Sequence, residues 1–340
     1  MAKETSVEVK IEGRTLKLTN LEKVLYPDFG FTKAQVIDYY TRIAPVLLPH
    51  TRDHPLTLKR YPNGVYGEFF YEKNCPKHRP PWVQTATVWS GGNNRDMYYC
   101  LAQDLPTLVW LANLATLEMH TSLSYCDNLP QPRTMVFDLD PGPPATIVEC
   151  CRMGLMLRDV FAEHGLECCA KTSGSKGLQL YLPLNTKVDY IQTKVVSKGL
   201  AQYFEEKHPD LAVHKQLKEL RTGRVLIDWS QNDQYKTTVN VYSLRARSRP
   251  TVSTPVSWDE VEKCYRAKDP SLLVFDSDQV LKRLDKLGDL FEPVLKKKQK
   301  LPQSLLKAMG GADAVEKMAT RRHGGGRRYP PQKGQRRPPE

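Results

Sequence analysis

Hydrophobic and polar positions follow two kinds of spacing along this chain, and the second half shows them most regularly. From Thr134 onward, short runs that alternate with a period of two predict strands, and longer runs with helical spacing separate them. The predicted elements are a strand over 134–139, a helix over 145–163, strands over 167–172 and 178–183, a helix over 189–207 and a strand over 224–229. This β-α-β-β-α-β order predicts a split βαβ, RRM-like sheet whose first and fourth strands are neighbours.

A smaller α/β unit is predicted ahead of that sheet. Residues 7–18 predict a hairpin, and Thr32 is placed to cap the helix that follows. Apolar positions at helical spacing predict another helix over 104–120. We therefore expect an α+β fold with an N-terminal α/β module over about 1–130 and an RRM-like module over about 131–250.

The composition changes after about residue 295. A lysine-rich stretch over 296–300 leads to one short predicted helix near 302–319 and then to a segment of Gly, Arg and Pro. Such a segment buries too little apolar surface to fold. We therefore expect one folded domain over 1–295 and a basic, disordered tail over 296–340.

The overall composition points to a polyanionic partner. The chain of 340 residues carries a formal net charge of +12 and has a pI near 9.2. No amphipathic basic helix stands out, so nucleic acid is favoured over a membrane. Neither a signal peptide nor an apolar run long enough to cross a bilayer is found, which predicts a soluble cytoplasmic protein.

None of the eight cysteines belongs to a Cys-x-x-Cys pair, which argues against a zinc site and favours burial as small hydrophobic residues.

Two carboxylates lie two residues apart at the end of the first strand of the RRM-like sheet. Asp138 and Asp140 therefore share one face, and Pro141-Gly142-Pro143-Pro144 ends the strand directly after them. Carboxylates this close repel each other unless a cation lies between them, and Mg²⁺ or Mn²⁺ suits oxygen ligands. The alternative is an exposed Asp-x-Asp in a turn, where Asp is common. Asp228 falls on the predicted neighbouring strand, and three converging carboxylates are what two-metal phosphoryl transfer requires.

Candidate phosphate contacts follow at the same end of the sheet. Ser173 and Lys176 belong to a turn of small residues whose backbone N–H groups can approach phosphate oxygens. The spacing of this turn is not that of a Walker A loop. Further along the chain, Lys236 and Arg245 add cations that suit a triphosphate.

The N-terminal module carries further candidates, each with a simpler alternative. Lys23 and Lys33 lie near the starts of predicted helical turns, which favour phosphate, or they are solvated surface lysines. Phe69 and Phe70 belong to three consecutive aromatics, so at least one ring is exposed and able to stack on a base. The alternative is a buried core with a single surface ring. His120 ends the predicted helix, either as a helix C-terminal residue or as an active-site residue.

Five motifs occur in a specific order between about residues 18 and 258. They are Val136-Phe-Asp-Leu-Asp-Pro-Gly, Thr172-Ser-Gly-Ser-Lys-Gly-Leu, Asp228-Trp-Ser-Gln-Asn, Lys236-Thr-Thr and Tyr242-Ser-Leu-Arg. Together they resemble the polymerase domain of bacterial DNA ligase D and its stand-alone relatives in the archaeo-eukaryotic primase superfamily. The resemblance implies a primase-type fold and a primase-polymerase catalytic domain over 1–295.

The resemblance also implies a role for each candidate residue. Two Mn²⁺ or Mg²⁺ ions would be held by Asp138, Asp140 and Asp228. The family's active-site histidine is matched by His120. The triphosphate of an NTP or dNTP would contact Ser173, Lys176, Lys236 and Arg245. The template would stack on Phe69 and Phe70, and the 5′-phosphate beyond a gap would be held by Asn20, Lys23 and Lys33.

One residue departs from the family's pattern. The phosphate loop of the family usually ends in Gly-x-His, and here Gln179 stands in the place of the histidine. A glutamine can donate a hydrogen bond to phosphate, but it cannot carry a positive charge. The exchange therefore bears on triphosphate affinity or catalytic rate and leaves the metal triad untouched, and Gln179 stays a candidate for nucleotide binding.

The expected function is that of a monomeric primase-polymerase in DNA repair by non-homologous end joining. It would extend a 3′-hydroxyl on gapped or broken DNA with a 5′-phosphate and, by family likeness, prefer ribonucleotides with Mn²⁺. No ligase or nuclease domain follows in the sequence, so a separate DNA ligase and end-binding repair proteins at the nucleoid are the expected partners. One alternative is an Asp-x-Asp glycosyltransferase, which has no use for Asp228 or for a 5′-phosphate pocket. The other is an RRM-like binding module that has lost catalysis, which only Gln179 supports.

Overall fold

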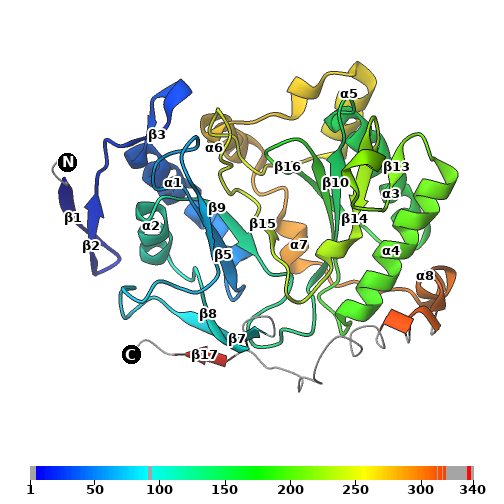
Figure 1. The fold of residues 1–340 in the computed structure, drawn as a ribbon, viewed down its shortest axis with the longest axis horizontal. Helices are drawn as coiled ribbons and strands as arrows, with labels where there is room; N and C mark the ends of the chain where they lie inside the picture. The colour runs from blue at the N-terminus through cyan, green and yellow to red at the C-terminus, as the bar shows by residue number, and fades with distance from the viewer. Residues whose placement is uncertain (1–4, 91–93, 312, 316, 319–334, 338–340) are drawn as a thin grey trace.

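Two large β-sheets stand next to each other in the computed structural model, with α1 and α2 on the outer side of one and α3 and α4 on the outer side of the other (Figure 1). The structure describes residues 5–90, 94–311, 313–315, 317–318 and 335–337. The elements of the first part are β1 (Ser6–Ile11), β2 (Arg14–Thr19), β3 (Val24–Tyr26), β4 (Phe31–Thr32), α1 (Lys33–Thr51), β5 (Leu56–Arg60), β6 (Phe70–Glu72), β7 (Thr85–Ser90), β8 (Arg95–Cys100), α2 (Leu105–Asn113) and β9 (Thr116–Thr121). The elements that follow are β10 (Thr134–Pro141), α3 (Ile147–Glu163), β11 (Cys169–Thr172), β12 (Leu178–Pro183), α4 (Tyr190–Lys207), β13 (Ala212–Val213), β14 (Val225–Asp228), β15 (Thr238–Val239), β16 (Pro255–Val256), α5 (Trp258–Ala267), α6 (Ser277–Leu287), α7 (Glu292–Lys296), α8 (Gln303–Ala308) and β17 (Gln335–Arg337).

The sheet of the N-terminal part has the strand order β15-β9-β5-β8-β7-β17, with β6 paired to β5. The predicted hairpin is confirmed as β1 and β2. Thr32 is confirmed as the N-cap of helix α1, where it forms a capping box with Gln35. Its buried Tyr39 and Tyr40 donate their hydroxyl hydrogens to the carbonyl oxygens of Tyr242 and Leu117. These bonds tie α1 both to its own sheet and to a segment more than 200 residues later in the chain.

The second sheet has the strand order β13-β14-β10-β12-β11-β16. The β-α-β-β-α-β order that the sequence predicts is confirmed, and β14 lies beside β10 as the fourth strand beside the first. Helices α3 and α4 begin with capping boxes at Thr146 and Asp189, close to the predicted starts. The short outer strands β13 and β16 extend this arrangement at both edges.

The alternation of side chains divides the second sheet into an apolar and a polar face. One face packs beneath α3 and α4 through Met135, Phe137 and Leu139 of β10 and Leu178, Leu180 and Leu182 of β12. The residues between them point to the other side, where Val136 and Tyr181 join the core of the N-terminal part. Asp138 and Asp140 share this second face. Their carboxylates therefore lie between the two parts of the molecule.

The helix predicted over 104–120 is wrong in its second half. Helix α2 ends at Asn113, Ala115 adopts a positive φ of 57°, and the chain continues as strand β9. Pairing of β9 with β5, far away in the sequence, stabilises the strand and is not encoded in local spacing. As a consequence, Glu118 and His120 lie on one face of a strand and not on a helix end.

Two expectations from composition can be compared with the structure. Five of the six free cysteines are buried, in line with a packing role, whereas Cys75 and Cys100 form a disulfide that the sequence did not suggest. Among the described residues, no helix is both long and apolar enough to cross a membrane.

The predicted C-terminal tail is described only in part. Helix α8 covers only Gln303–Ala308 of the short helix predicted near 302–319. The sequence predicts a disordered tail from residue 296, but Leu305 and Leu306 of α8 are buried in the core beside the second sheet. For residues 312, 316, 319–334 and 338–340 the prediction of disorder falls outside the described residues. Between them, Gln335–Arg337 pair with the outer strand β7 as β17.

A buried asparagine completes the hydrogen bonding of β10 where its neighbour β14 has already ended. The side chain of Asn232 accepts the N–H of Val136 at 2.9 Å and donates to its carbonyl oxygen at 2.7 Å. A second bond from the same amide group reaches the carbonyl oxygen of Trp229 at 3.1 Å. Asn232 thus takes the place of one further strand residue and holds the turn after Asp228 against β10.

We predict that Asn232→Ala destabilises the protein, because it leaves buried polar groups of Val136 without a partner. The expected loss is about 1–3 kcal/mol for each unsatisfied group, measured by urea unfolding. The control is Asn128→Ala, since Asn128 is exposed and its side chain bonds to Gln131, which lies close by in the chain. Equal unfolding free energies for the two variants would contradict the role of Asn232.

Candidate active site

A row of polar side chains crosses the middle of the second sheet. In the antiparallel register, Asp138 of β10 lies directly opposite Asp228 of β14 on one side and opposite Gln179 of β12 on the other. Residues directly opposite each other in a sheet project from the same face. Asp140 follows Asp138 by two residues on that face. The strand pairing thus brings together the three aspartates that the sequence singled out.

Except for Asp228, the residues of this row line a cleft between the two sheets with a volume of about 500 Å³. The second sheet contributes Asp138, Asp140 and Gln179, and the N-terminal sheet contributes His120 from β9. Further lining residues are Thr57, Tyr71, Lys73, Ser173, Ser175, Gln231, Tyr235, Lys236, Thr237, Thr238, Val239, Arg245 and Arg247. Of the predicted nucleotide contacts, Ser173, Gln179, Lys236 and Arg245 therefore converge on one cavity.

The carboxylates of β10 lie in a site that disfavours their charge. Burial raises the pKa of Asp138 to about 7, and the neighbouring charge of Asp140 adds to the effect. Burial and the charge of Asp228 raise the pKa of Asp140 as well. Oδ1 of Asp138 is buried and has no hydrogen-bond partner among the described residues. An oxygen in this position fits a divalent cation, which would also relieve the repulsion between the carboxylates.

Asp228 is held differently. Its Oδ1 accepts hydrogen bonds from the backbone N–H of Ser230 at 3.0 Å, from the Ser230 hydroxyl at 2.5 Å and from Gln216 at 3.0 Å. Its Oδ2 accepts a hydrogen bond from Gln231 at 3.1 Å. Within the described part of the chain, no three His, Cys, Asp or Glu side chains are close enough together to hold a metal ion. The strand register places Asp228 opposite Asp138, but the Asp228 carboxylate is held by its own donors. It would have to turn away from these donors to bind a metal ion together with Asp138 and Asp140.

The hairpin between β11 and β12 is pressed against the end of β10. A Cβ added at Gly177 would lie 2.1 Å from the carbonyl oxygen of Leu139, and Gly174 has a positive φ of 66°. The hydroxyl of Ser173 accepts the N–H groups of Ser175 at 3.3 Å and Gly177 at 3.1 Å, which closes the turn. Only glycine allows this close approach, so the loop composition that predicted a phosphate site also fits its packing.

Cations surround this hairpin. The guanidinium of Arg245 donates to the carbonyl oxygen of Ser173, and the guanidinium of Arg247 donates to the hydroxyl of Ser175. From the turn after β14, Lys236 donates to the hydroxyl of Ser230 at 2.5 Å. These three cations lie along the rim of the cleft and provide a positive potential next to the carboxylates.

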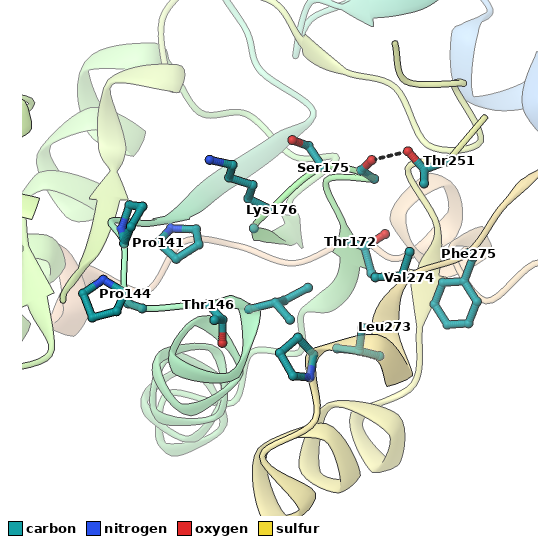
Figure 2. Close-up of a pocket in the computed structure, with 16 residues that line it drawn as sticks. Pro141, Pro144, Thr146, Thr172, Ser175, Lys176, Thr251, Leu273, Val274 and Phe275 are labelled. Atoms are coloured by element: carbon teal, nitrogen blue, oxygen red, sulfur yellow. Dashed lines mark hydrogen bonds between the residues drawn. The ribbon is translucent and has the colours of Figure 1, made fainter. Parts of the chain in front are cut away.

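Lys176 is the one predicted triphosphate contact that does not line the cleft. It is exposed and extends from the hairpin beside a second cavity of about 360 Å³, whose wall includes Pro144 and Phe275 (Figure 2). Its charge still lowers the pKa of Asp140, against the larger raising effect of burial. Thr251 bonds to the carbonyl oxygen of Gly174 at 2.6 Å and holds the far side of the hairpin (Figure 2).

Glu118 connects the cations of the cleft to the N-terminal sheet. Its carboxylate is buried and contacts His120 at 3.0 Å, Arg245 at 3.4 Å and Lys59 at 3.8 Å. Burial alone would raise the pKa of Glu118, but the hydrogen bond from His120 and the neighbouring cations lower it well below its usual range. For His120, burial lowers the pKa and Glu118 opposes that effect. Glu118 therefore stays ionised and orients both Arg245 and the imidazole.

The three consecutive aromatic residues all have exposed rings, whereas the alternative was a buried core with a single surface ring. Phe69, Phe70 and Tyr71 have exposed fractions of 50%, 43% and 59%. The ammonium of Lys59 lies 4.3 Å from the ring centroid of Phe69, and the guanidinium of Arg60 lies 5.1 Å from that of Phe70. Exposed rings beside cations form a surface on which bases can stack while phosphates are neutralised.

Of the three candidates for a 5′-phosphate, two are joined by the backbone. The N–H of Lys33 donates to the carbonyl oxygen of Lys23 at 2.8 Å, and Asn20 precedes them with a positive φ of 51°. Lys23 is exposed and donates to Asn63 at 3.2 Å. Lys33 is only 6% exposed, and its ammonium bonds to the carbonyl oxygen and hydroxyl of Thr19. The two lysines thus lie side by side but differ in accessibility, and none of these residues lines the cleft.

Sequence reasoning missed several residues of the site. Glu118 lies two positions before His120, so a strand interpretation would have placed both on one face, whereas the helix interpretation hid this relation. Lys59 and Lys171 have no local signal, because only strand pairing brings them to the site. Gln216 reaches Asp228 from a segment with no regular pattern.

Comparison with known proteins agrees with this geometry. A family model described as "LigD, primase-polymerase domain" matches residues 32–291. The chain is similar to the polymerase domain of Mycobacterium tuberculosis ligase D, solved in complex with DNA, with a TM-score of 0.77, 38% sequence identity, and coverage of 84% of this chain and 99% of that one.

Curated relatives support the same assignment. The multifunctional non-homologous end joining protein LigD of Mycolicibacterium smegmatis is 40% identical over 281 residues, which are 82% of this chain and 36% of the relative. The bifunctional LigD of Bacillus subtilis is 29% identical over 292 residues, which are 86% of this chain and 46% of the relative. The chain thus spans less than half the length of these relatives. Its own residues, matched over most of their length by the family model, place it in the LigD primase-polymerase family.

Proposed function

We propose that this chain is a template-dependent nucleotidyltransferase that fills short gaps and break ends in DNA during non-homologous end joining. The observation that carries this proposal is the buried, unpartnered Oδ1 of Asp138 beside Asp140 and opposite Asp228, in a cleft rimmed by cations. Carboxylates that repel each other next to fixed positive charges suit a reaction in which metal ions and a triphosphate meet. The names of the relatives, and the DNA in the M. tuberculosis structure, support the same partner class.

The proposed chemistry assigns a task to each side of the cleft. Asp138, Asp140 and Asp228 would hold two Mn²⁺ or Mg²⁺ ions, which when bound supply activation of the 3′-hydroxyl and charge neutralisation of the leaving pyrophosphate. Arg245, Lys236 and the hairpin at Ser173 would orient the triphosphate, with Lys176 and Gln179 at its borders and His120 opposite. We propose ribonucleotides as the preferred substrates, with dNTPs also accepted.

DNA would be held outside the cleft. We propose that the template stacks on Phe69 and Phe70 and that the downstream 5′-phosphate binds near Asn20, Lys23 and Lys33. The enzyme would act as a monomer, and its partners would be a separate DNA ligase and end-binding repair proteins. The basic segment after residue 318, most of which lies outside the described residues, would add binding to DNA without sequence preference.

The first prediction from the proposed function concerns the carboxylates. Asp138→Ala or Asp140→Ala should abolish nucleotide addition in a primer-extension assay on gapped DNA with Mg²⁺ or Mn²⁺, because both remove oxygen ligands of the reaction centre. DNA affinity, measured by fluorescence anisotropy, should stay close to wild type, since the basic surface supplies it. The exposed Asp210→Ala is the control. Extension by either variant near the wild-type rate would refute the metal assignment, and a wild-type protein that binds DNA without extending it would identify a binding module.

The second prediction concerns the 5′-phosphate. Gap filling should be about ten- to a hundred-fold faster when the downstream strand carries a 5′-phosphate than when it ends in a hydroxyl, because charge-assisted contacts favour the dianion. Lys23→Ala with Lys33→Ala should erase this difference and spare extension on an open template end. Lys23→Ala alone should remove most of it, because Lys23 is the exposed member of the pair.

A matched control for the lysine variant is available on the N-terminal hairpin. Lys10 and Lys17 are both exposed, so Lys10→Ala with Lys17→Ala changes the net charge equally without touching the proposed pocket. This control should keep the preference for the phosphorylated gap. If wild-type enzyme fills both gaps at the same rate, these residues do not form a phosphate pocket.

A further inference from the structure

The row of polar residues that contains Asp138 ends in a buried lysine. Lys171 of β11 lies directly opposite Gln179 in the sheet register, just as Gln179 lies opposite Asp138. The side chain is fully buried, with an exposed fraction of 0%. Asp228, Asp138, Gln179 and Lys171 therefore form one continuous row across four neighbouring strands.

The ammonium group of Lys171 has specific partners in this position. It donates to Oε1 of Gln179 at 2.5 Å and to the hydroxyl of Ser253 at 2.6 Å. It also lies 5.3 Å from the ring centroid of Tyr181. A buried lysine costs stability compared with an apolar side chain of similar size, so its presence in the middle of a sheet calls for a role other than packing.

The contact with Lys171 decides which way the amide group of Gln179 points. Nζ of Lys171 donates to Oε1 of Gln179, so the amide oxygen of Gln179 faces the lysine. The amide NH₂ is then directed to the opposite side, where Asp138 lies directly opposite Gln179 in the sheet register and where Gln179 lowers the pKa of its carboxylate against the larger raising effect of burial. Without Lys171, the amide group could turn around and present its oxygen to the carboxylate, because the two ends have the same shape.

We propose that Lys171 is a positioning residue that acts through Gln179 to hold the Asp138 carboxylate in the orientation that leaves Oδ1 available for a divalent cation. The inference rests on the proposed function only in taking Asp138 as a metal ligand. In this proposal, Gln179 orients a metal ligand in addition to lining the cleft. It also accounts for a lysine that no step of nucleotide addition contacts directly.

The test is a double-mutant cycle read by Mn²⁺ binding, without nucleotide or DNA. The proteins are wild type, Lys171→Met, Gln179→Leu and the double variant, and free Mn²⁺ is followed by electron paramagnetic resonance. Each single variant should bind Mn²⁺ about 10- to 100-fold more weakly, as is usual when a residue supporting a metal ligand is removed. The double variant should bind no more weakly than the weaker single variant, because Lys171 acts through Gln179.

Two further measurements separate positioning from a general loss of structure. Lys171→Met should unfold at a temperature at least as high as wild type, since a buried charge is replaced by an apolar side chain of similar length. In primer extension, its loss of rate should shrink as Mn²⁺ is raised, which a disordered site would not show. The control Ser253→Ala removes the other acceptor of Lys171 and should bind Mn²⁺ within about twofold of wild type.

Several results would overturn the inference. Unchanged Mn²⁺ affinity in Lys171→Met would do so, as would losses that multiply in the double variant or an equal loss in Ser253→Ala. If Lys171→Met does not fold, Gln179→Leu decides alone, and an unchanged Mn²⁺ affinity of that variant rejects the proposal. If the four proteins bind Mn²⁺ as expected but the wild type adds no nucleotide, the proposed function is refuted and the positioning role of Lys171 remains.

Discussion

Repulsion between carboxylates on neighbouring strands is the constraint on which the rest of this structure depends. Asp138 and Asp228 face each other across β10 and β14, and Asp140 follows on the same face. Burial disfavours the charged carboxylates and the repulsion between them adds to this effect, so the pKa values of Asp138 and Asp140 are raised. A sheet tolerates such a site only if other interactions fix the strands, and here the opposite, apolar face packs beneath α3 and α4.

The polar face is balanced by positive charge from distant parts of the chain. Arg245 and Lys236 come from segments after β14. Glu118 of the N-terminal sheet fixes Arg245 and His120 in turn. The cleft is therefore a property of both sheets together, and the bonds of Tyr39 and other α1 residues across the two parts help to keep its walls in place.

The neighbours of position 179 explain how a glutamine fits where the family usually has a histidine. Position 179 lies inside the sheet, where a side chain contacts Asp138 on one side and Lys171 on the other. A neutral amide can satisfy both neighbours at once because it carries an acceptor and a donor. The amide of Gln179 therefore lies between Asp138 and Lys171, which is one strand further away in this row.

By itself, the sequence determined the alternation of strands and helices after Thr134, the end of β10 at its proline run, and the close spacing of Asp138 and Asp140. These features depend on neighbours along the chain, so local pattern is enough to find them. Family resemblance added the roles of individual residues, and none of those roles follows from local pattern alone. The strand β9 was misread as helix because its pairing with β5 is a long-range contact that local spacing does not encode. For the same reason, only the tertiary structure decided that Glu118 contacts Arg245 and that Lys171 bonds to Gln179. It also decided that Lys33 is buried while Lys23 is exposed. The energy of a side chain depends on the distant groups that surround it, and these groups meet only when the chain has folded.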